Sequence, residues 1–395
     1  MEETNAPPYK GLKVLDLSQG IAGPYCAEIL VQNGCDVIKV EPPGGDWGRG
    51  IGFAPEGMSA LALAYNMGKR SISLDAGSDQ GRTILRELAS RADIIVESFR
   101  PGVMERFGLS YAQLSRDNPK LVYVSVSAFG SDGPYAERRG SDSTLQAMSG
   151  LMMANRDAQG TPRKIGILIV DVSTGLYAAQ ATATALYRRA TRGEGAHVQV
   201  SLLDASAAIQ ANAIIEATLT AGRPRTPYSV PAGTFATANG HINVTSLHDR
   251  MFAGLCRAVG REDWLDDPRF SDSQARFRHA ADINKALEDI FLTHPSEHWM
   301  RILGEQSVVC GPISGYQDFL ADPQVKQCDI FQQVDHPGLP PVSVPRVPGV
   351  QPQATLRPAP RVGEHTRAIL IEMGRQGADI DDLFETGVVC GPAPS

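Results

Sequence analysis

Residues 11–41 read GLKVLDLSQGIAGPYCAEILVQNGCDVIKVE, and this stretch decides the fold class. Residues 12–17 and 37–40 are short apolar runs rich in β-branched residues, which predict buried strands. The same pattern recurs further along the chain, with strands expected at residues 94–96 and 121–126 and a helix at residues 80–92. Strands that alternate with helices are typical of βαβ units. The sequence therefore predicts an α/β fold whose large domain is Rossmann-like, with a parallel, doubly wound sheet.

The middle of the chain predicts more helices and then a domain boundary. We expect helices at residues 175–189 and 205–219, with a strand at residues 197–203 between them. At residues 222–230 the composition shifts to Gly, Arg, Pro and Thr, which is typical of a linker. We therefore expect a large domain over residues 1–222, a smaller α+β domain over 223–330, and a return to the large domain over 331–395.

The return segment is rich in proline. Eight prolines fall within residues 337–361. Because proline lacks a backbone N–H donor, this stretch predicts an extended connection rather than a packed element. Two short helices are expected after it, at residues 364–374 and 379–385.

The composition argues against several classes of function. The formal net charge is −7, whereas general nucleic-acid binders present a net basic surface. No apolar run reaches the ~18 residues of a membrane-spanning helix, and the N-terminus lacks the regions of a secretory signal. The six cysteines are scattered without a Cys-x-x-Cys pair. We therefore expect a cytoplasmic protein that binds neither nucleic acid nor membrane.

Familiar cofactor motifs are not matched either. The turn after the first strand, residues 16–24, fails the dinucleotide pattern Gly-x-Gly-x-x-Gly, because Pro24 stands beside its last glycine. This turn can still present N–H groups to a phosphate or a thiolate at the start of a helix. Pro295 separates His294 from His298 and breaks the helical face they would share, so no metal site is expected. A Gly-x-Ser-x-Gly elbow is also missing from the sequence, which argues against a serine hydrolase.

Several segments in a consistent order carry a family resemblance. They are DLSQGIAGPYC (16–26), GCDVIKVEPPGGDWGR (34–49), NMGKRSISLD (66–75), VESFRPGVMERFGLSY (96–111), GILIVDVSTGLYAA (166–179), HVQVSLLDA (197–205) and DPRF (267–270). Together they resemble the family III CoA-transferases, the group of formyl-CoA transferase and carnitine CoA-transferase. The resemblance extends over nearly the whole chain.

The resemblance implies a catalytic role for Asp171. In this family an aspartate in such a turn attacks the acyl-CoA thioester, and here the turn is residues 170–175, VDVSTG. From the residues alone, Asp171 is either a nucleophile or an ordinary cap at the start of the alanine-rich helix, which we expect to begin after Gly175. We expect the helix dipole to keep its carboxylate ionised.

The implied chemistry needs a CoA thioester as substrate and no metal, redox cofactor or other prosthetic group. Asp171 attacks the thioester carbonyl and forms a mixed anhydride, releasing CoA thiolate. The thiolate returns to give an aspartyl-CoA thioester, and the donor acid leaves. A free carboxylic acid then accepts CoA by the reverse sequence. The resemblance points to a small dicarboxylate as acceptor.

The resemblance also implies the residues that contact CoA. Ile21 and Ala22 would border the thiol and pantetheine, Leu74 and Asp75 an adenine-side wall, and Arg106 a phosphate. The full set adds Ser98, where many members have Asn, and Phe99, Arg100, Arg138, Arg139, Gly140 and Ser141. For each arginine, a solvated surface charge is the alternative.

Ser141 and Asp142 distinguish transfer from a related reaction. The 2-methylacyl-CoA racemases of this family have Gly-His-Asp where this chain has Gly140-Ser141-Asp142. Serine is too weak a base to replace imidazole, so transfer is favoured over racemisation. Asp142 could orient the acceptor or the surroundings of Asp171, or cap a helix that begins near Thr144. A racemase with a base from elsewhere and a non-catalytic CoA-binding homologue remain the alternatives.

The resemblance finally implies an assembly. Each subunit of an interlocked homodimer would thread through its partner, and CoA would lie between one large domain and the partner's small domain. The proline-rich return at residues 337–361 would suit closure of such a ring.

Overall fold

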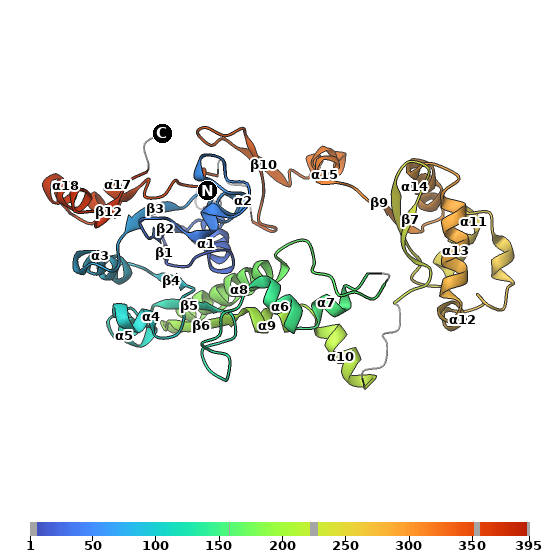
Figure 1. Cartoon of the computed structure of the whole chain (residues 1–395), viewed down its shortest axis with the longest axis horizontal. Coiled ribbons are helices and arrows are strands. Elements are labelled where there is room, and N and C mark those ends of the chain that lie inside the picture. The colour runs from blue at the N-terminus through green and yellow to red at the C-terminus, as the bar shows by residue number, and fades with distance from the viewer. Residues whose placement is uncertain (1–5, 158, 222–227, 351–355, 393–395) are drawn as a thin grey trace. The chain divides into compact units, whose positions relative to one another are not determined.

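A seven-stranded sheet organises the larger part of the chain in the computed structural model, which describes residues 6–157, 159–221, 228–350 and 356–392 (Figure 1). The strand order is β12-β3-β2-β1-β4-β5-β6, and all pairs are parallel except β12 with β3. The bounds are β1 Lys13–Asp16, β2 Asp36–Glu41, β3 Arg70–Leu74, β4 Ile94–Glu97, β5 Val122–Ser127, β6 Ala196–Ser201 and β12 Val389–Cys390. The predicted α/β class with a parallel, Rossmann-like sheet is confirmed.

Helices connect these strands. They are α1 Ala22–Gln32, α2 Ala60–Asn66, α3 Asp79–Ser90, α4 Val103–Phe107, α5 Tyr111–Asp117, α6 Asp142–Met148, α7 Leu151–Ala154, α8 Ile169–Arg192, α9 Leu202–Ala208, α17 Thr366–Glu372 and α18 Gly377–Glu385. Two 3-10 turns, η2 Trp47–Gly50 and η3 Pro55–Gly57, follow β2.

The strand side chains supply two separate apolar cores. Val14 and Val96 belong to the core with α1 and α8, whereas Leu15 and Ile95 belong to the core with α3, α17 and α18. Successive side chains of a strand point to opposite faces of the sheet. A parallel sheet buried on both faces therefore needs the continuous apolar runs that the sequence shows.

The chain divides into two compact units, residues 1–212 with 330–395 and residues 213–329. The smaller unit has an antiparallel sheet in the order β7-β8-β9, with its own core around Phe252, Phe291 and Trp299. Its elements are β7 Ala232–Ala236, β8 His241–Thr245, β9 Val309–Pro312, η4 Glu262–Leu265, α11 Asp249–Ala258, α12 Ser273–Arg278, α13 Ala280–Phe291, α14 Ser296–Glu305, α15 Tyr316–Ala321 and α16 Pro323–Gln327. Residues 222–227, within the predicted linker, lie outside the described residues.

Three predictions of local structure are wrong. The strand expected at 197–203 ends at Ser201, because Ser201 forms a capping box with Asp204 and starts α9 there. The helix expected at 205–219 is interrupted, and its second part is α10 Ala211–Leu219. The proline-rich return also contains packed structure, because β10 Phe331–Val334 and β11 Val342–Pro345 pair antiparallel and bury Val334 and Val344. Residues 351–355 of that segment lie outside the described part.

Two buried lysines, Lys39 in β2 and Lys69 just before β3, tie these strands to the carboxyl end of β1. Lys69 Nζ lies 2.7 Å from Asp16 Oδ2 and also donates to the carbonyl of Pro24 at 2.9 Å. Lys39 Nζ lies 3.0 Å from Asp46 Oδ2 and donates to the carbonyl of Ser18 at 2.9 Å. All these charged groups are almost completely buried, so each charge depends on its partner.

Replacing one partner should therefore be costly. We expect Lys69→Met to lower the free energy of unfolding by about 3–5 kcal/mol, because it leaves the Asp16 carboxylate buried without its nearest cation. Arg188→Met, which breaks an exposed ion pair with Glu194, should cost far less, because water screens that pair. Urea unfolding followed by circular dichroism measures both. Equal losses in the two variants would show that the buried Asp16 carboxylate does not depend on Lys69.

Candidate functional site

The order of strands places a crevice beside β1. β1 pairs with β2 on one side and with β4 on the other, so successive connections leave this point in opposite directions. Ligands of open α/β sheets bind at such a switch point, at the carboxyl ends of the strands. A cavity of about 650 Å³ lies there, lined by segments that follow β1, β4 and β5 and by the first turn of α8.

Most of the predicted site residues line this cavity. They are Ile21, Ala22, Ser98, Phe99, Arg100, Arg138, Arg139, Gly140, Ser141 and Asp171. The other four lie elsewhere: Leu74 is buried in the core at the end of β3, Asp75 follows it, Arg106 is exposed on α4, and Asp142 is buried at the start of α6. Whether Leu74, Asp75 and Arg106 contact CoA remains a prediction.

The loop after β1 is held rigidly against the sheet. The Gln19 N–H donates to Ser98 Oγ at 2.9 Å, so the hydroxyl at this position joins the loops after β1 and β4. The Gly20 N–H donates to both oxygens of Asp46, at 3.0 and 3.1 Å. Asp46 is held in turn by Lys39. The buried ion network therefore determines where this wall of the cavity lies.

The amino end of α1 faces the same cavity. Ile21, Ala22 and Gly23 line it, and no side chain caps this helix end. Gly23 is required by close packing, because a Cβ there would lie 2.3 Å from Ser18 Cβ. Unsatisfied N–H groups at a helix start favour anions. The expected place for a CoA thiolate is therefore available, and its occupation remains a prediction.

Asp171 lies in the first turn of a helix that starts earlier than predicted. α8 begins at Ile169 instead of after Gly175, because the carboxylate of Asp142 caps it. Asp142 Oδ2 accepts from the N–H groups of Val170, at 2.8 Å, and of Asp171, at 3.2 Å. Gly175 is inside the helix, where the absence of a Cβ allows close packing against Ala22 and Tyr25 of α1.

Asp142 does not cap its own helix. Ser141 is the N-cap of α6 and accepts from the Thr144 N–H at 3.4 Å, whereas Asp142 caps α8. Gln146, fully buried, donates to the other oxygen of Asp142 at 2.6 Å. Of the roles left open by the sequence, the geometry matches the one in which Asp142 orients the surroundings of Asp171.

The expectation that Asp171 is readily ionised is wrong. Burial and, second, the nearby carboxylate of Asp142 raise the pKa of Asp171 to about 7, against the opposing effect of the Lys164 charge. The loss of hydration and the like charge outweigh the helix dipole, which is weak in comparison and is already shared with Asp142. Tyr65 lies in the same surroundings, and burial raises the pKa of its hydroxyl to about 12. Near neutral pH, Asp171 is therefore poised between its two protonation states.

The cationic wall of the cavity is partly preorganised. The Arg138 guanidinium lies 5.1 Å from the ring centre of Tyr135 and 5.9 Å from that of Phe129. Gly140 allows this turn to pack closely, because a Cβ there would lie 2.5 Å from Ala128 Cβ. Stacked guanidinium groups lose less entropy when they bind an anion.

Sequence reasoning missed several residues of the site. Gln19, Gly23, Trp47, Pro101, Val126, Ser127, Ala128, Ala136 and Leu202 also line the cavity. Trp47 had a usable signal, because a tryptophan in the glycine-rich run GGDWG of a resembling segment suggests an exposed ring, and its side chain is indeed 56% exposed. Gln146 gave no such signal, because its hydrogen bonds join segments that are distant in the chain.

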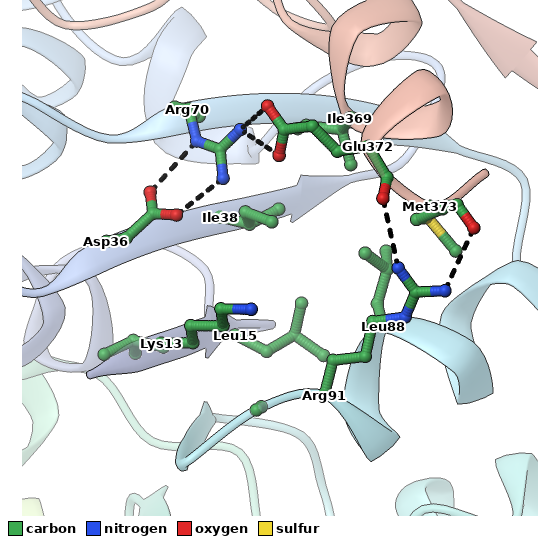
Figure 2. A pocket seen from close by; sticks show the side chains of 12 residues that line it. Lys13, Leu15, Asp36, Ile38, Arg70, Leu88, Arg91, Ile369, Glu372 and Met373 are labelled. Carbon is green, nitrogen blue, oxygen red and sulfur yellow. Dashed lines mark hydrogen bonds and ion pairs between the residues drawn. The ribbon is translucent and has the colours of Figure 1, made fainter. Parts of the chain in front are cut away.

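A smaller hollow of about 100 Å³ lies at the other end of the strands, where β1, β2 and β3 begin (Figure 2). Arg70 there bridges Asp36 and Glu372, and Arg91 donates to the carbonyls of Glu372 and Met373. These polar groups satisfy one another and fasten α17 to the sheet. The hollow is therefore structural, although it is well formed.

Two other kinds of site were sought among the described residues. None of their His, Cys, Asp and Glu side chains gather in groups of at least three that could hold a metal ion. Within those residues, no helix has the length and apolar character to cross a membrane.

Comparison with known proteins identifies the family. The model of CoA-transferase family III matches residues 9–366. A succinate–glutarate CoA-transferase of Agrobacterium fabrum is 33% identical, covering 93% of this chain and 96% of the relative. An acetyl-CoA:oxalate CoA-transferase of Acetobacter aceti is 35% identical, covering 78% and 80%. The crystal structure of a CAIB/BAIF family protein from Brucella suis has a TM-score of 0.83 at 33% identity, covering 93% of this chain and all of that one. The chain therefore belongs to CoA-transferase family III.

Proposed function

We propose that this protein moves CoA from an acyl-CoA to a small dicarboxylic acid, with Asp171 as the covalent nucleophile. The observation that carries the proposal is the position of Asp171. Asp171 lines the same cavity as the open amino end of α1, and the pKa of its carboxyl group is about 7. A carboxylate of this basicity is a stronger nucleophile than an ordinary one, yet a large fraction is ionised near neutral pH.

The proposed reaction balances without an external acid or base. Asp171 attacks the thioester carbonyl, the C–S bond breaks, and the CoA thiolate leaves an aspartyl anhydride. The thiolate then attacks the Asp171 carbonyl of the anhydride, forms the aspartyl-CoA thioester and releases the donor acid. The acceptor carboxylate attacks this thioester and expels the thiolate again. Finally the thiolate attacks the acceptor carbonyl and regenerates the Asp171 carboxylate.

The cavity offers matching partners for the ends of CoA. Arg100, Arg138 and Arg139 can bind its phosphates by charge-assisted hydrogen bonds. The first turn of α1 can stabilise the thiolate, because no side chain caps this helix end and its N–H groups favour an anion. Leu74 and Asp75 remain candidates for the adenine side, and Arg106 for a CoA phosphate.

The names of relatives support a dicarboxylate acceptor, since they specify succinate with glutarate and, for another, oxalate. A transfer screen with succinyl-CoA and acetyl-CoA against a panel of acids, read by mass spectrometry, tests this directly. CoA exchange to dicarboxylates is expected. Deuterium incorporation at the substrate α-carbon without exchange would instead indicate the racemase alternative.

The assembly and the cellular location belong to the proposal as well. We infer an interlocked homodimer from the family resemblance and a reducing cytoplasm from the six free cysteines, of which Cys26, Cys35 and Cys256 are buried. Light scattering of the purified protein tests the dimer.

The first test replaces the nucleophile. We expect Asp171→Ala to lower kcat by on the order of 10³-fold or more, because the variant lacks the carboxylate that forms the anhydride. Hydroxylamine trapping of the acyl-enzyme should label the wild type and spare this variant. Asp117→Ala, an exposed aspartate on α5, is the control and should behave like the wild type. Retained transfer by Asp171→Ala would refute the nucleophile.

The second test uses pH. Since Asp171 must be ionised to attack, kcat/KM for the acyl-CoA should rise with pH through about 7 and level off above it. Asp142→Asn removes the like charge, which should lower the pKa of Asp171 and move this limb to lower pH.

The same variant should have a lower plateau. An amide has one acceptor oxygen, so it cannot serve both Gln146 and the α8 N–H groups as Asp142 does. Asp117→Asn should leave the limb in place. A limb that stays near pH 7 in Asp142→Asn would show that Asp142 does not influence Asp171.

A further inference from the structure

Lys164 is a cation close to Asp171 that does not belong to the cavity lining. It lies in the segment between α7 and α8, with an exposed side chain. Its Nζ donates to Ser143 Oγ at 2.9 Å. Ser143 follows Asp142 directly in α6, and Asp142 binds the Asp171 N–H. The ammonium group is therefore anchored one residue from the carboxylate that positions the nucleophile.

The backbone beside Lys164 is fixed to the same framework. The Ile165 N–H donates to Gln146 Oε1 at 3.0 Å, and Gln146 Nε2 donates to the carbonyl of Ile167 at 3.3 Å. Gln146 is fully buried and also holds Asp142. Because the backbone that follows Lys164 is tied to Gln146, this lysine can keep a more constant place relative to α8 than an ordinary surface lysine.

Three titratable side chains from different parts of the chain surround Asp171. Asp142 on α6 carries a negative charge, Tyr65 on α2 is neutral, and Lys164 supplies the positive charge that opposes the raised pKa of Asp171. The cationic residues of the cavity, Arg100, Arg138 and Arg139, face the space that CoA must fill. The CoA phosphates would neutralise the charge of these three arginines. Lys164 is then the cation near Asp171 that can bind a second anion.

We infer that Lys164 holds the distal carboxylate of a dicarboxylate acceptor and so determines acceptor specificity. The inference rests on the proposed CoA transfer. The other carboxylate of the acceptor attacks the aspartyl-CoA thioester, one C–O bond forms, the C–S bond breaks, and CoA leaves as thiolate. Lys164 forms no covalent bond and transfers no proton. It orients the acceptor and offsets the repulsion between the acceptor and Asp142.

The test compares acceptors that differ only at the distal group. With succinyl-CoA as donor, glutarate carries a distal carboxylate, its monoamide an uncharged group of the same shape, and pentanoate a methyl group. We expect Lys164→Gln to raise KM for glutarate by about 10- to 100-fold, the range for a lost charged hydrogen bond. KM for the monoamide and KM for pentanoate should change less than about threefold. The same limit applies to KM for succinyl-CoA, measured with the monoamide as acceptor.

Matched variants separate this role from a general change of charge. Arg163→Gln removes the neighbouring cation, which is paired with Asp157 at 2.8 Å, and should leave all acceptor constants unchanged. Lys164→Arg should recover most of the preference for glutarate. Lys164→Gln should also move the acid limb of the pH profile upward, since it removes the charge that lowers the pKa of Asp171.

Two failures have different meanings. If wild-type protein transfers CoA to none of the acids, the proposed function itself is refuted. If the wild type uses glutarate and Lys164→Gln keeps the same ratio of kcat/KM between glutarate and its monoamide, Lys164 is a solvated surface lysine and the inference is overturned.

Discussion

The arrangement of the site depends on one buried cluster of charges, where the carboxyl ends of β1 and β2 meet the start of β3. Asp16 and Asp46 are both out of contact with water, and Lys39 and Lys69 provide their counter-charges. Buried pairs of this kind add little net stability compared with apolar packing, but they tolerate no rearrangement. Here they hold the Ser18 and Pro24 carbonyls and, through Asp46, the Gly20 N–H. The loop that borders the cavity is thus fixed before any ligand binds.

A second carboxylate, Asp142, fixes the opposite side of the site and does so at a cost. Capping two N–H groups of α8 stabilises the helix, but it also brings a negative charge beside Asp171. The pKa of Asp171 lies above its value in an unfolded chain, so the native state loses stability as pH rises from about 4 to about 7. The proposed reaction uses this destabilised carboxylate, since its ionised form gains most by forming a bond to carbon.

A feature could be predicted from the sequence when the residues that determine it are close together in the chain. Apolar periodicity is local, so the strands β1, β2, β4 and β5 and the helix α3 could be located from short windows. The start of α8 could not, because its cap is 29 residues away from Asp171 in the chain. The pairing of β10 with β11 was missed because proline count outweighed the alternating valines. Cavity residues were found where the resembling segments covered them. Gln146 and Lys164 went unnoticed, since their importance lies in contacts that only the fold creates.

The raised pKa of Asp171 also constrains the second half of the proposed reaction, in which CoA passes from Asp171 to the acceptor. The anhydride between Asp171 and the acceptor has two carbonyls that the thiolate can attack. Attack on the acceptor carbonyl releases the Asp171 carboxylate, and attack on the Asp171 carbonyl releases the acceptor. A carboxylate with a pKa of about 7 is a poorer leaving group than a free acid whose pKa is near 4.3, as for a glutamate side chain. On basicity alone, the thiolate would therefore return to Asp171. Productive transfer requires that geometry override this bias, by holding the acceptor carbonyl toward the thiolate at the start of α1. An anchor at the far end of the acceptor provides such an orientation, and this is why a fixed cation near Asp171 matters more to transfer than to the formation of the aspartyl thioester.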